Sequence, residues 1–129
     1  MATWWNDYMN NAVQGQSFFA LANDTLLEGA AVDMKEAEVG LHADLQTGVI
    51  ASGSHAIKLQ ESEDGLTNWA DIEDAVFATL VSGGPDDNDS RSLNFKRSKR
   101  YVRAVADSTG SGDYAVSIHG LRKAGPYPS

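Results

Sequence analysis

Hydrophobic and polar residues alternate with a period of two along much of the chain after residue 30. In Ala37–Gln46 an apolar residue occupies every second position, and His55–Glu61 shows the same alternation. Successive side chains of a β-strand point to opposite faces, so this pattern predicts strands with one buried and one solvated face. Both segments are therefore predicted to be strands that pack one face on a core.

Other apolar runs are separated by clusters of turn-forming residues. Among these clusters, Ser82–Ser90 is predicted to be an exposed loop, and Gly110-Ser111-Gly112 is predicted to connect a hairpin. Short strands with turn signals about every 8–12 residues predict an all-β fold, an antiparallel sandwich or barrel. No strand–helix alternation of the kind that builds a parallel sheet is present. The further predicted strands are residues 75–81, 92–95, 100–106 and 114–121.

The first 28 residues follow a different pattern. In Trp4–Val13 the apolar residues recur at helical spacing, but the Asn and Asp residues between them favour turns over helix interiors. This segment is predicted to be a short helix or an irregular arm, and Ser17–Ala22 a first strand or a second helical turn. We therefore divide the chain into an N-terminal arm (1–28) that can complete the sandwich, a β-sandwich domain (29–123) and an extended C-terminal tail (124–129).

Composition narrows the class of protein. The length of 129 residues fits one domain, and 42% hydrophobic and 22% charged residues are typical of a globular protein. The chain has no cysteine, which excludes disulfides and thiolate metal ligands. The start of the sequence lacks the basic and apolar regions of a signal peptide, and no stretch approaches the roughly 20 apolar residues of a membrane span. We expect a protein made in the cytoplasm that does not bind membranes.

The charges are distributed unevenly around a net charge of −8. Residues 1–90 contain 2 basic and 16 acidic residues, a net charge of −14, whereas residues 91–129 contain 8 basic and 2 acidic residues, a net charge of +6. The acidic surroundings would repel phosphate backbones, which argues against nucleic acid. The basic stretch is interpreted as a solvated or internally paired strand face, with protein docking as the alternative. It consists of Arg91, Lys96, Arg97, Lys99, Arg100 and Arg103.

Candidate catalytic residues are few. Ser54 and His55 are neighbours, but neighbours on a strand point to opposite faces and cannot form a nucleophile–base pair. His42, His55 and His119 show no pair at metal-binding spacing and are interpreted as polar positions on solvated strand faces. The acidic residues of 61–74 fall in turn segments and are interpreted as solvated, with a glycosidase pair as the alternative. The sequence therefore predicts a protein that is not an enzyme and has no cofactor.

Two further features each have a functional alternative. Asp86-Asp87-Asn88-Asp89 offers oxygen ligands for calcium, but it lacks the EF-hand spacing and the distal Glu, so a solvated loop is favoured. Trp69 follows a turn and is interpreted as a core residue, with sugar stacking as the alternative. Tyr101 and Tyr114 lie on predicted strands and share that alternative.

The stretch Lys58–Ile72 resembles a hairpin found in small virion proteins of tailed bacteriophages. The pattern is QES-x-DG-x-x-W-x-D-Φ, where Φ is aliphatic, and this stretch contains each of its residues in order, with one extra residue between Gly65 and Trp69. Residues 29–34 and 100–105 are similar to strands that precede and follow that hairpin, so the resemblance covers residues 29–121.

This resemblance implies a structural role. Members of the class that decorate or cement capsids are commonly β-sandwiches, often jelly rolls, arranged as trimers on the shell. By resemblance, we expect a jelly-roll-like sandwich that binds the major capsid protein and itself, as a homotrimer on the capsid surface of the virion. The alternatives are a virion protein associated with the neck, tail or fibre, and a carbohydrate-binding module.

The docking surface is a separate hypothesis, because the resemblance does not include it. Aromatic residues ahead of a sandwich need a surface to pack on, either their own sheet or a neighbouring protein. The uneven charge would favour contacts between complementary surfaces of neighbouring subunits. The candidate partner-binding residues are Trp4, Trp5, Tyr8, Phe18, Phe19, Arg97, Lys99 and Arg100.

Overall fold

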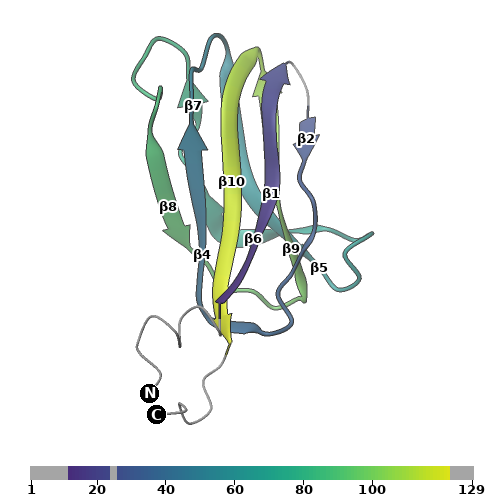
Figure 1. The fold of residues 1–129 in the computed structure, drawn as a ribbon. Coiled ribbons are helices and arrows are strands. Elements are labelled where there is room, and N and C mark those ends of the chain that lie inside the picture. Colours follow the sequence, from purple (N-terminus) through teal and green to yellow (C-terminus); the bar gives the residue numbers. More distant parts are fainter. Residues whose placement is uncertain (1–11, 24–25, 123–129) are drawn as a thin grey trace, which may run out of the picture.

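Two antiparallel sheets pack face to face and form a β-sandwich (Figure 1). The computed structural model describes the backbone of residues 12–23 and 26–122 and the side chains of residues 26–121. In hydrogen-bonding order, the first sheet contains β1 (Ala12–Asn23), β10 (Ser111–Arg122), β4 (Ala37–Thr47) and β8 (Ser90–Asn94). The second sheet contains β2 (Leu26–Glu28), β9 (Tyr101–Thr109), β5 (Ser54–Ser62) and β6 (Ala70–Val76), with β3 (Val32–Asp33) beside β9 and β7 (Leu80–Val81) beside β5. None of the described segments forms a helix long and apolar enough to cross a membrane.

The strand pairing is that of a jelly roll. Apart from the short β3 and β7, the strands pair from the two ends of the chain inward: β1 with β10, β2 with β9, β4 with β8, and β5 with β6. These pairs alternate between the first and the second sheet. Pairing of β10 with β4 and of β9 with β5 then completes each sheet. The predicted antiparallel, jelly-roll-like sandwich is confirmed.

Side chains from the inner faces of both sheets form the apolar core. The period-two pattern holds for Leu41, Ala43 and Leu45 in β4 and for Ile57 and Leu59 in β5, all of which are buried. Each large apolar side chain contributes about 1.5–3 kcal/mol when it is fully buried. Other large buried residues of the core are Met34, Ile50, Leu80, Val102, Tyr114, Val116 and Ile118.

A β-bulge interrupts the alternation near the start of β4. Two residues of β4, Gly40 and Leu41, oppose the single residue Gly120 of β10. Gly40 has a φ of 61°, the left-handed conformation that glycine adopts readily at the first position of such bulges. The bulge shifts the phase of the strand, and Val39, predicted on the buried side, is 46% exposed.

The predicted strand at residues 75–81 is wrong. β6 ends at Val76, and the next strand, β7, begins at Leu80. Asp74 has a left-handed φ of 63°, which shows that the backbone of β6 is irregular shortly before its end. Phe77 and Leu80 still bury their side chains in the core. The apolar run therefore indicated burial correctly, but not a continuous strand.

Contrary to the prediction, the segment Gly110-Ser111-Gly112 does not connect a hairpin. It joins β9 of the second sheet to β10 of the first sheet, so the chain crosses from one layer to the other. Gly110 has a φ of 108°, and a Cβ atom there would lie 2.5 Å from the carbonyl oxygen of Ser52. Glycine residues indicated a tight turn correctly, but they carry no information on which sheet the next strand joins.

The N-terminal segment lies partly outside the described residues. Of the predicted helix or arm at Trp4–Val13, only Ala12 and Val13 are described, and they belong to β1, where the backbone is extended instead of helical. Ser17–Ala22 is a strand, the first of its two predicted alternatives. Since β1 pairs with β10 and β2 with β9, the described part of residues 1–28 is built into both sheets. The predicted tail at 124–129 lies outside the described residues.

Candidate functional site

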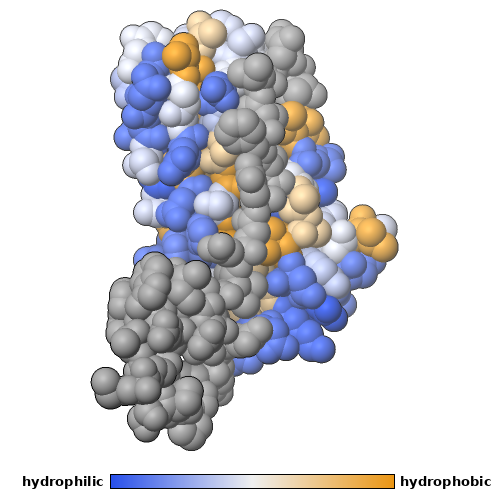
Figure 2. All heavy atoms as spheres, viewed as in Figure 1, coloured by the Kyte–Doolittle hydropathy of each residue, from blue (hydrophilic) through white to orange (hydrophobic). Residues whose placement is uncertain are grey.

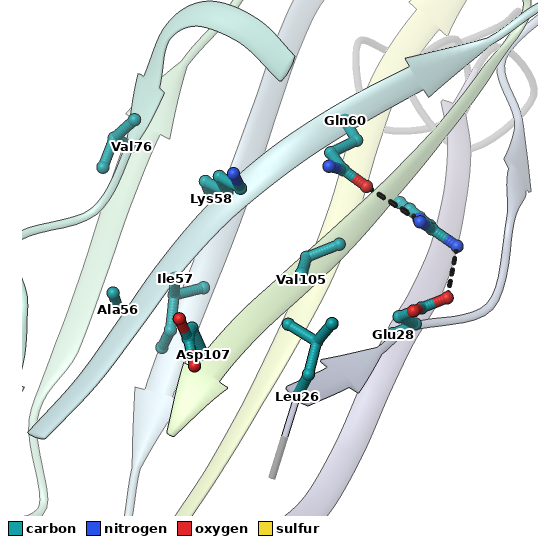
Figure 3. A pocket seen from close by; sticks show the side chains of 10 residues that line it. Leu26, Glu28, Ala56, Ile57, Lys58, Gln60, Val76, Val105 and Asp107 are labelled. Carbon is teal, nitrogen blue, oxygen red and sulfur yellow. Dashed lines mark hydrogen bonds and ion pairs between the residues drawn. The ribbon is translucent and has the colours of Figure 1, made fainter. Parts of the chain in front are cut away.

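A shallow groove of about 400 Å³ crosses the outer face of the second sheet (Figure 3). Val105 in β9 lies in its floor and is buried although it faces outward, because the strands on either side flank it. Leu26 in β2 and Val76 in β6, which are 55% and 61% exposed, come from the two edges of the sheet. The polar lining residues are Glu28, Lys58, Gln60, Arg103 and Asp107. The groove thus combines an apolar floor with charges of both signs.

Arg103 connects this groove to Trp69. Its Nε and Nη2 atoms donate to Gln60 Oε1 at 3.1 and 2.9 Å, and its Nη1 donates to Glu28 Oε2 at 3.0 Å (Figure 3). The guanidinium carbon lies 4.2 Å from the centroid of the Trp69 ring, a cation–π arrangement. The interpretation of Trp69 as a core residue is therefore wrong. The chain enters β6 through Asn68, which has a left-handed φ of 56°, and the partly buried Trp69 lies over Arg103.

Asp64 and Gly65 stabilise the turn of the hairpin between β5 and β6. Asp64 Oδ1 accepts from the backbone N–H groups of Leu66 and Thr67, each at 2.9 Å, and Asp64 Oδ2 accepts from Thr67 Oγ1 at 2.8 Å. These hydrogen bonds hold the pKa of Asp64 well below its usual range, and the one from the backbone N–H of Thr67 has the largest effect. Gly65 has a φ of 73°, and a Cβ atom there would lie 3.0 Å from the ring of Tyr101. The turn therefore requires Asp64 and Gly65 for its shape.

Glu61 stabilises the turn that precedes β9. Its buried carboxylate accepts from Ser98 N at 2.9 Å, Ser98 Oγ at 2.6 Å and Lys99 N at 3.3 Å. The carboxylate of Asp71 is also engaged, because it accepts from Lys58 Nζ and Gln60 Nε2, each at 2.9 Å. The hydrogen bond from Gln60, and then that from Lys58, lower the pKa of Asp71. Glu61 is therefore buried, in contrast to the predicted solvated state, whereas Asp71 is exposed as predicted and pairs at the surface.

The basic stretch is largely paired within the chain, as its first interpretation held. Arg97 donates to the carbonyl oxygen of Ala37 at 3.1 and 2.9 Å and to that of Lys99 at 3.1 Å. Arg100 binds both carboxylate oxygens of Asp33, at 2.9 and 2.7 Å, and these hydrogen bonds lower the pKa of Asp33 to about 2. A partner-binding role for Arg97, Lys99 and Arg100 stays a prediction. A partner that binds Arg97 or Arg100 would have to leave their internal hydrogen bonds in place or replace them.

The predicted aromatic docking residues are only partly placed. Trp4, Trp5 and Tyr8 lie outside the described residues. Phe18 and Phe19 belong to β1, where they oppose Val116 and Ala115 of β10. Only the backbone of β1 is described, so the proposed docking of these aromatic side chains stays a prediction.

The loop between β7 and β8 uses its carboxylates to hold its own shape. Asp86 is buried, in contrast to the predicted fully exposed loop, and its Oδ2 accepts from the backbone N–H of Val81 at 2.7 Å. Arg91 binds the carboxylates of both Asp86 and Asp89. Asp87 Oδ1 accepts from the backbone N–H of Ile50 at 2.9 Å. The calcium alternative would therefore require these internal contacts to be replaced.

His55 does not lie on a solvated face, so its interpretation is wrong. It is fully buried, its Nε2 lies 3.1 Å from the carbonyl oxygen of Ser52, and its Nδ1 lies 3.3 Å from the hydroxyl of Tyr114. The carbonyl can only accept, so Nε2 carries the proton and Nδ1 accepts from Tyr114. The Tyr114 hydroxyl also lies 2.6 Å from Ser108 Oγ, and burial raises the pKa of Tyr114. His55 therefore belongs to a polar network in the core.

The other two histidines lie together on the outer face of the first sheet. His42 in β4 opposes His119 in β10, and their rings stack with centroids 4.7 Å apart. Asp44 Oδ2 lies 3.2 Å from His119 Nε2 and 3.7 Å from His42 Nε2. Burial, and then the neighbouring His42, lower the pKa of His119, while Asp44 opposes this effect. Sequence reasoning placed these residues on a solvated face but could not show that the strands that carry them are neighbours.

Comparisons with known proteins leave the family open. No protein-family model matches the chain, and no curated protein matches its sequence. A solved chain from the Bacillus endospore appendages, "a novel family of disulfide-linked pili", is similar in structure with a TM-score of 0.49 and 14% sequence identity over 88% of this chain and 90% of that chain.

Proposed function

We propose that this chain is a structural virion protein of a tailed bacteriophage that decorates and stabilises the capsid. It binds the major capsid protein through the outer face of the second sheet. The observation that carries the proposal is the stacked Trp69–Arg103 pair beside the groove. Tryptophan, tyrosine and arginine are the residue types most enriched at the energetic centres of protein interfaces. Their position next to an apolar floor with charged walls suits a protein partner of complementary charge.

Exposed apolar residues extend this surface. Leu26 and Val76 are both more than half exposed at the groove, and Leu66, at 81%, lies in the loop between β5 and β6. Figure 2 shows hydrophobic residues on this loop where it protrudes from the side of the sandwich. Isolated exposed apolar residues are common on protein surfaces, but two that line one groove, Leu26 and Val76, favour an interaction site.

Self-association has a separate structural basis. Within the described residues, β1 is an edge strand that pairs on one side, with β10, over almost its whole length. A long edge strand offers unpaired N–H and C=O groups to a further strand. We therefore expect subunits to contact one another along β1, in the homotrimer that the resemblance implies.

The test is binding to capsid shells assembled from the major capsid protein of the same genome. Cosedimentation should show saturable binding of the chain, with sedimentation velocity reporting its oligomeric state. Val76→Asp places a charge at the groove and should weaken binding at least tenfold. Val39→Asp places the same charge at an exposed valine of the first sheet and should leave binding unchanged. A stable monomer without affinity for shells would contradict the proposal, and a copy number of a dozen or fewer per particle would favour the neck or tail instead.

A carbohydrate-binding module is the second candidate, because Trp69 is partly exposed instead of buried in the core. Arg103 covers one face of the ring, so a sugar would stack on the other face. Hits on a glycan array that Trp69→Ala abolishes, with no binding to shells, would favour this function over capsid decoration.

A further inference from the structure

Three potential metal ligands converge on the outer face of the first sheet, away from the groove of the second sheet. His42 and His119 oppose each other across the β4–β10 pair, and Asp44 follows two residues after His42 on the same face. One ring nitrogen of each histidine and a carboxylate oxygen of Asp44 all lie within 4.8 Å of one another. The side chains of all three residues are partly exposed, so a cation can reach these atoms from solvent.

The separations are close to those of ligands that share one cation. With bonds of about 2.1 Å, two ligands at a tetrahedral angle lie about 3.4 Å apart. Asp44 Oδ2 lies 3.2 Å from His119 Nε2 and 3.7 Å from His42 Nε2. The strands therefore hold two ligand pairs near the required distance, and rotation of the imidazole rings sets the third.

Hydrogen bonding orients His42 for this role. Its Nδ1 lies 3.0 Å from the carbonyl oxygen of Gly40, and since a carbonyl can only accept, Nδ1 carries the proton. Neutral His42 then has its lone pair on Nε2, the atom nearest Asp44. Histidine ligands of metals commonly donate their other N–H to a backbone carbonyl in this way. The left-handed Gly40 of the β-bulge supplies that carbonyl, and bulges often re-aim side chains at functional sites.

We propose that His42, His119 and Asp44 bind one divalent transition-metal cation of the zinc class. Two imidazole nitrogens and one carboxylate oxygen favour Zn²⁺, Cu²⁺, Ni²⁺ or Co²⁺ over Ca²⁺ and Mg²⁺, which prefer oxygen ligands. Three protein ligands leave a further coordination position for water on the solvent side.

Binding requires two local changes. The imidazole planes, which lie 14° from parallel, tilt so that both Nε2 lone pairs meet at the cation. Ser117 Oγ, which lies 2.9 Å from His119 Nε2, gives up this contact. Both changes involve partly exposed side chains on an outer sheet face, so the core does not have to move.

The experiment is calorimetric titration of the untagged full chain with zinc sulfate. The wild type should bind one equivalent, and His42→Gln, His119→Gln and Asp44→Asn should each weaken the affinity at least tenfold. Asp71→Asn, which changes a carboxylate on the second sheet, is the matched control and should bind as the wild type does. An excess of Mg²⁺ should not displace the zinc.

A second measurement does not depend on the variants folding. One equivalent of Cu²⁺ added to the wild type should give an electron paramagnetic resonance spectrum with coupling to two imidazole nitrogens. The proposal is overturned if the wild type does not bind zinc at millimolar concentrations, if the three variants bind like the control, or if the copper spectrum lacks imidazole coupling.

Discussion

The hydroxyl of Tyr114 in the first sheet lies 3.3 Å from Nδ1 of His55 in the second sheet, so a hydrogen bond links the two layers inside the core. Ser108 Oγ lies 2.6 Å from the same hydroxyl. A buried polar group that loses its partner keeps the full cost of its desolvation, about 1–3 kcal/mol. The three side chains therefore depend on one another.

Removal of this hydroxyl should destabilise the fold. Tyr114→Phe keeps the ring in place but removes the hydroxyl that contacts His55 Nδ1 and Ser108 Oγ. We therefore expect a loss of about 1–3 kcal/mol in the free energy of unfolding. Urea denaturation measures this loss, with an unchanged slope showing that the unfolding reaction is the same. Equal midpoints for the variant and the wild type would show that the network contributes nothing.

The buried carboxylate of Glu61 should contribute more to the stability of the fold than the exposed carboxylate of Glu63. Glu61→Ala removes the acceptor for Ser98 N, Ser98 Oγ and Lys99 N, and hydrogen bonds to a charged group contribute about 1.5–3 kcal/mol. We expect a stability loss of about 2 kcal/mol in urea denaturation. Glu63→Ala, two residues away and exposed, is the control and should change stability by less than about 0.5 kcal/mol.

Much of the core was predictable from the pattern of residues. The alternation in β4 and β5 identified Leu41, Leu45, Ile57 and Leu59 as buried, because a strand has only two faces. His55 has the same parity as Ile57, so the same rule would have placed it in the core. The error came from treating histidine as a surface residue by type instead of by position.

Other features depend on contacts between distant parts of the chain. The His42–His119 pair exists because β4 and β10 are neighbours in register, and periodicity does not specify which strands pair. The position of Trp69 depends on the left-handed backbone at Asn68, a conformation that asparagine tolerates but does not require. The crossing at Gly110 depends on its close approach to Ser52 in the connection between β4 and β5. Local sequence therefore indicated which segments form strands, but it could not predict the His42–His119 pair or the Trp69–Arg103 pair, which depend on which strands are neighbours.

Acid should weaken the fold partly through Asp33. Hydrogen bonds from Arg100 lower its pKa from 3.8 to about 2, so this carboxylate binds its proton less readily in the folded state than in the unfolded state. The resulting stabilisation is present above about pH 4 and is lost as the pH falls toward 2. It is small, because the pair is exposed to solvent.

Asp33→Asn and Arg100→Gln should each reduce the pH dependence of the unfolding free energy between about pH 4 and 2. Urea denaturation at a series of pH values measures this slope. The double variant should behave like either single variant, because both remove the same ion pair. A slope equal to that of the wild type in both single variants would show that the ion pair does not form in solution.

Gly53 should be the least replaceable residue of the turn before β5. A Cβ atom there would lie 1.2 Å from the carbonyl oxygen of Thr109, a distance that no side-chain movement can relieve, and its φ of 74° disfavours any other residue. Gly53→Ala must therefore separate the start of β5 from the end of β9, at an expected cost of at least about 3 kcal/mol. Gly84 has a φ of 103°, but nothing lies within 4 Å of the corresponding Cβ position. Gly84→Ala is thus a control for backbone strain alone, with an expected cost of about 1 kcal/mol. Thermal and urea denaturation of the two variants should separate them clearly, and equal losses would show that the crowding at Thr109 relaxes when the side chain is added.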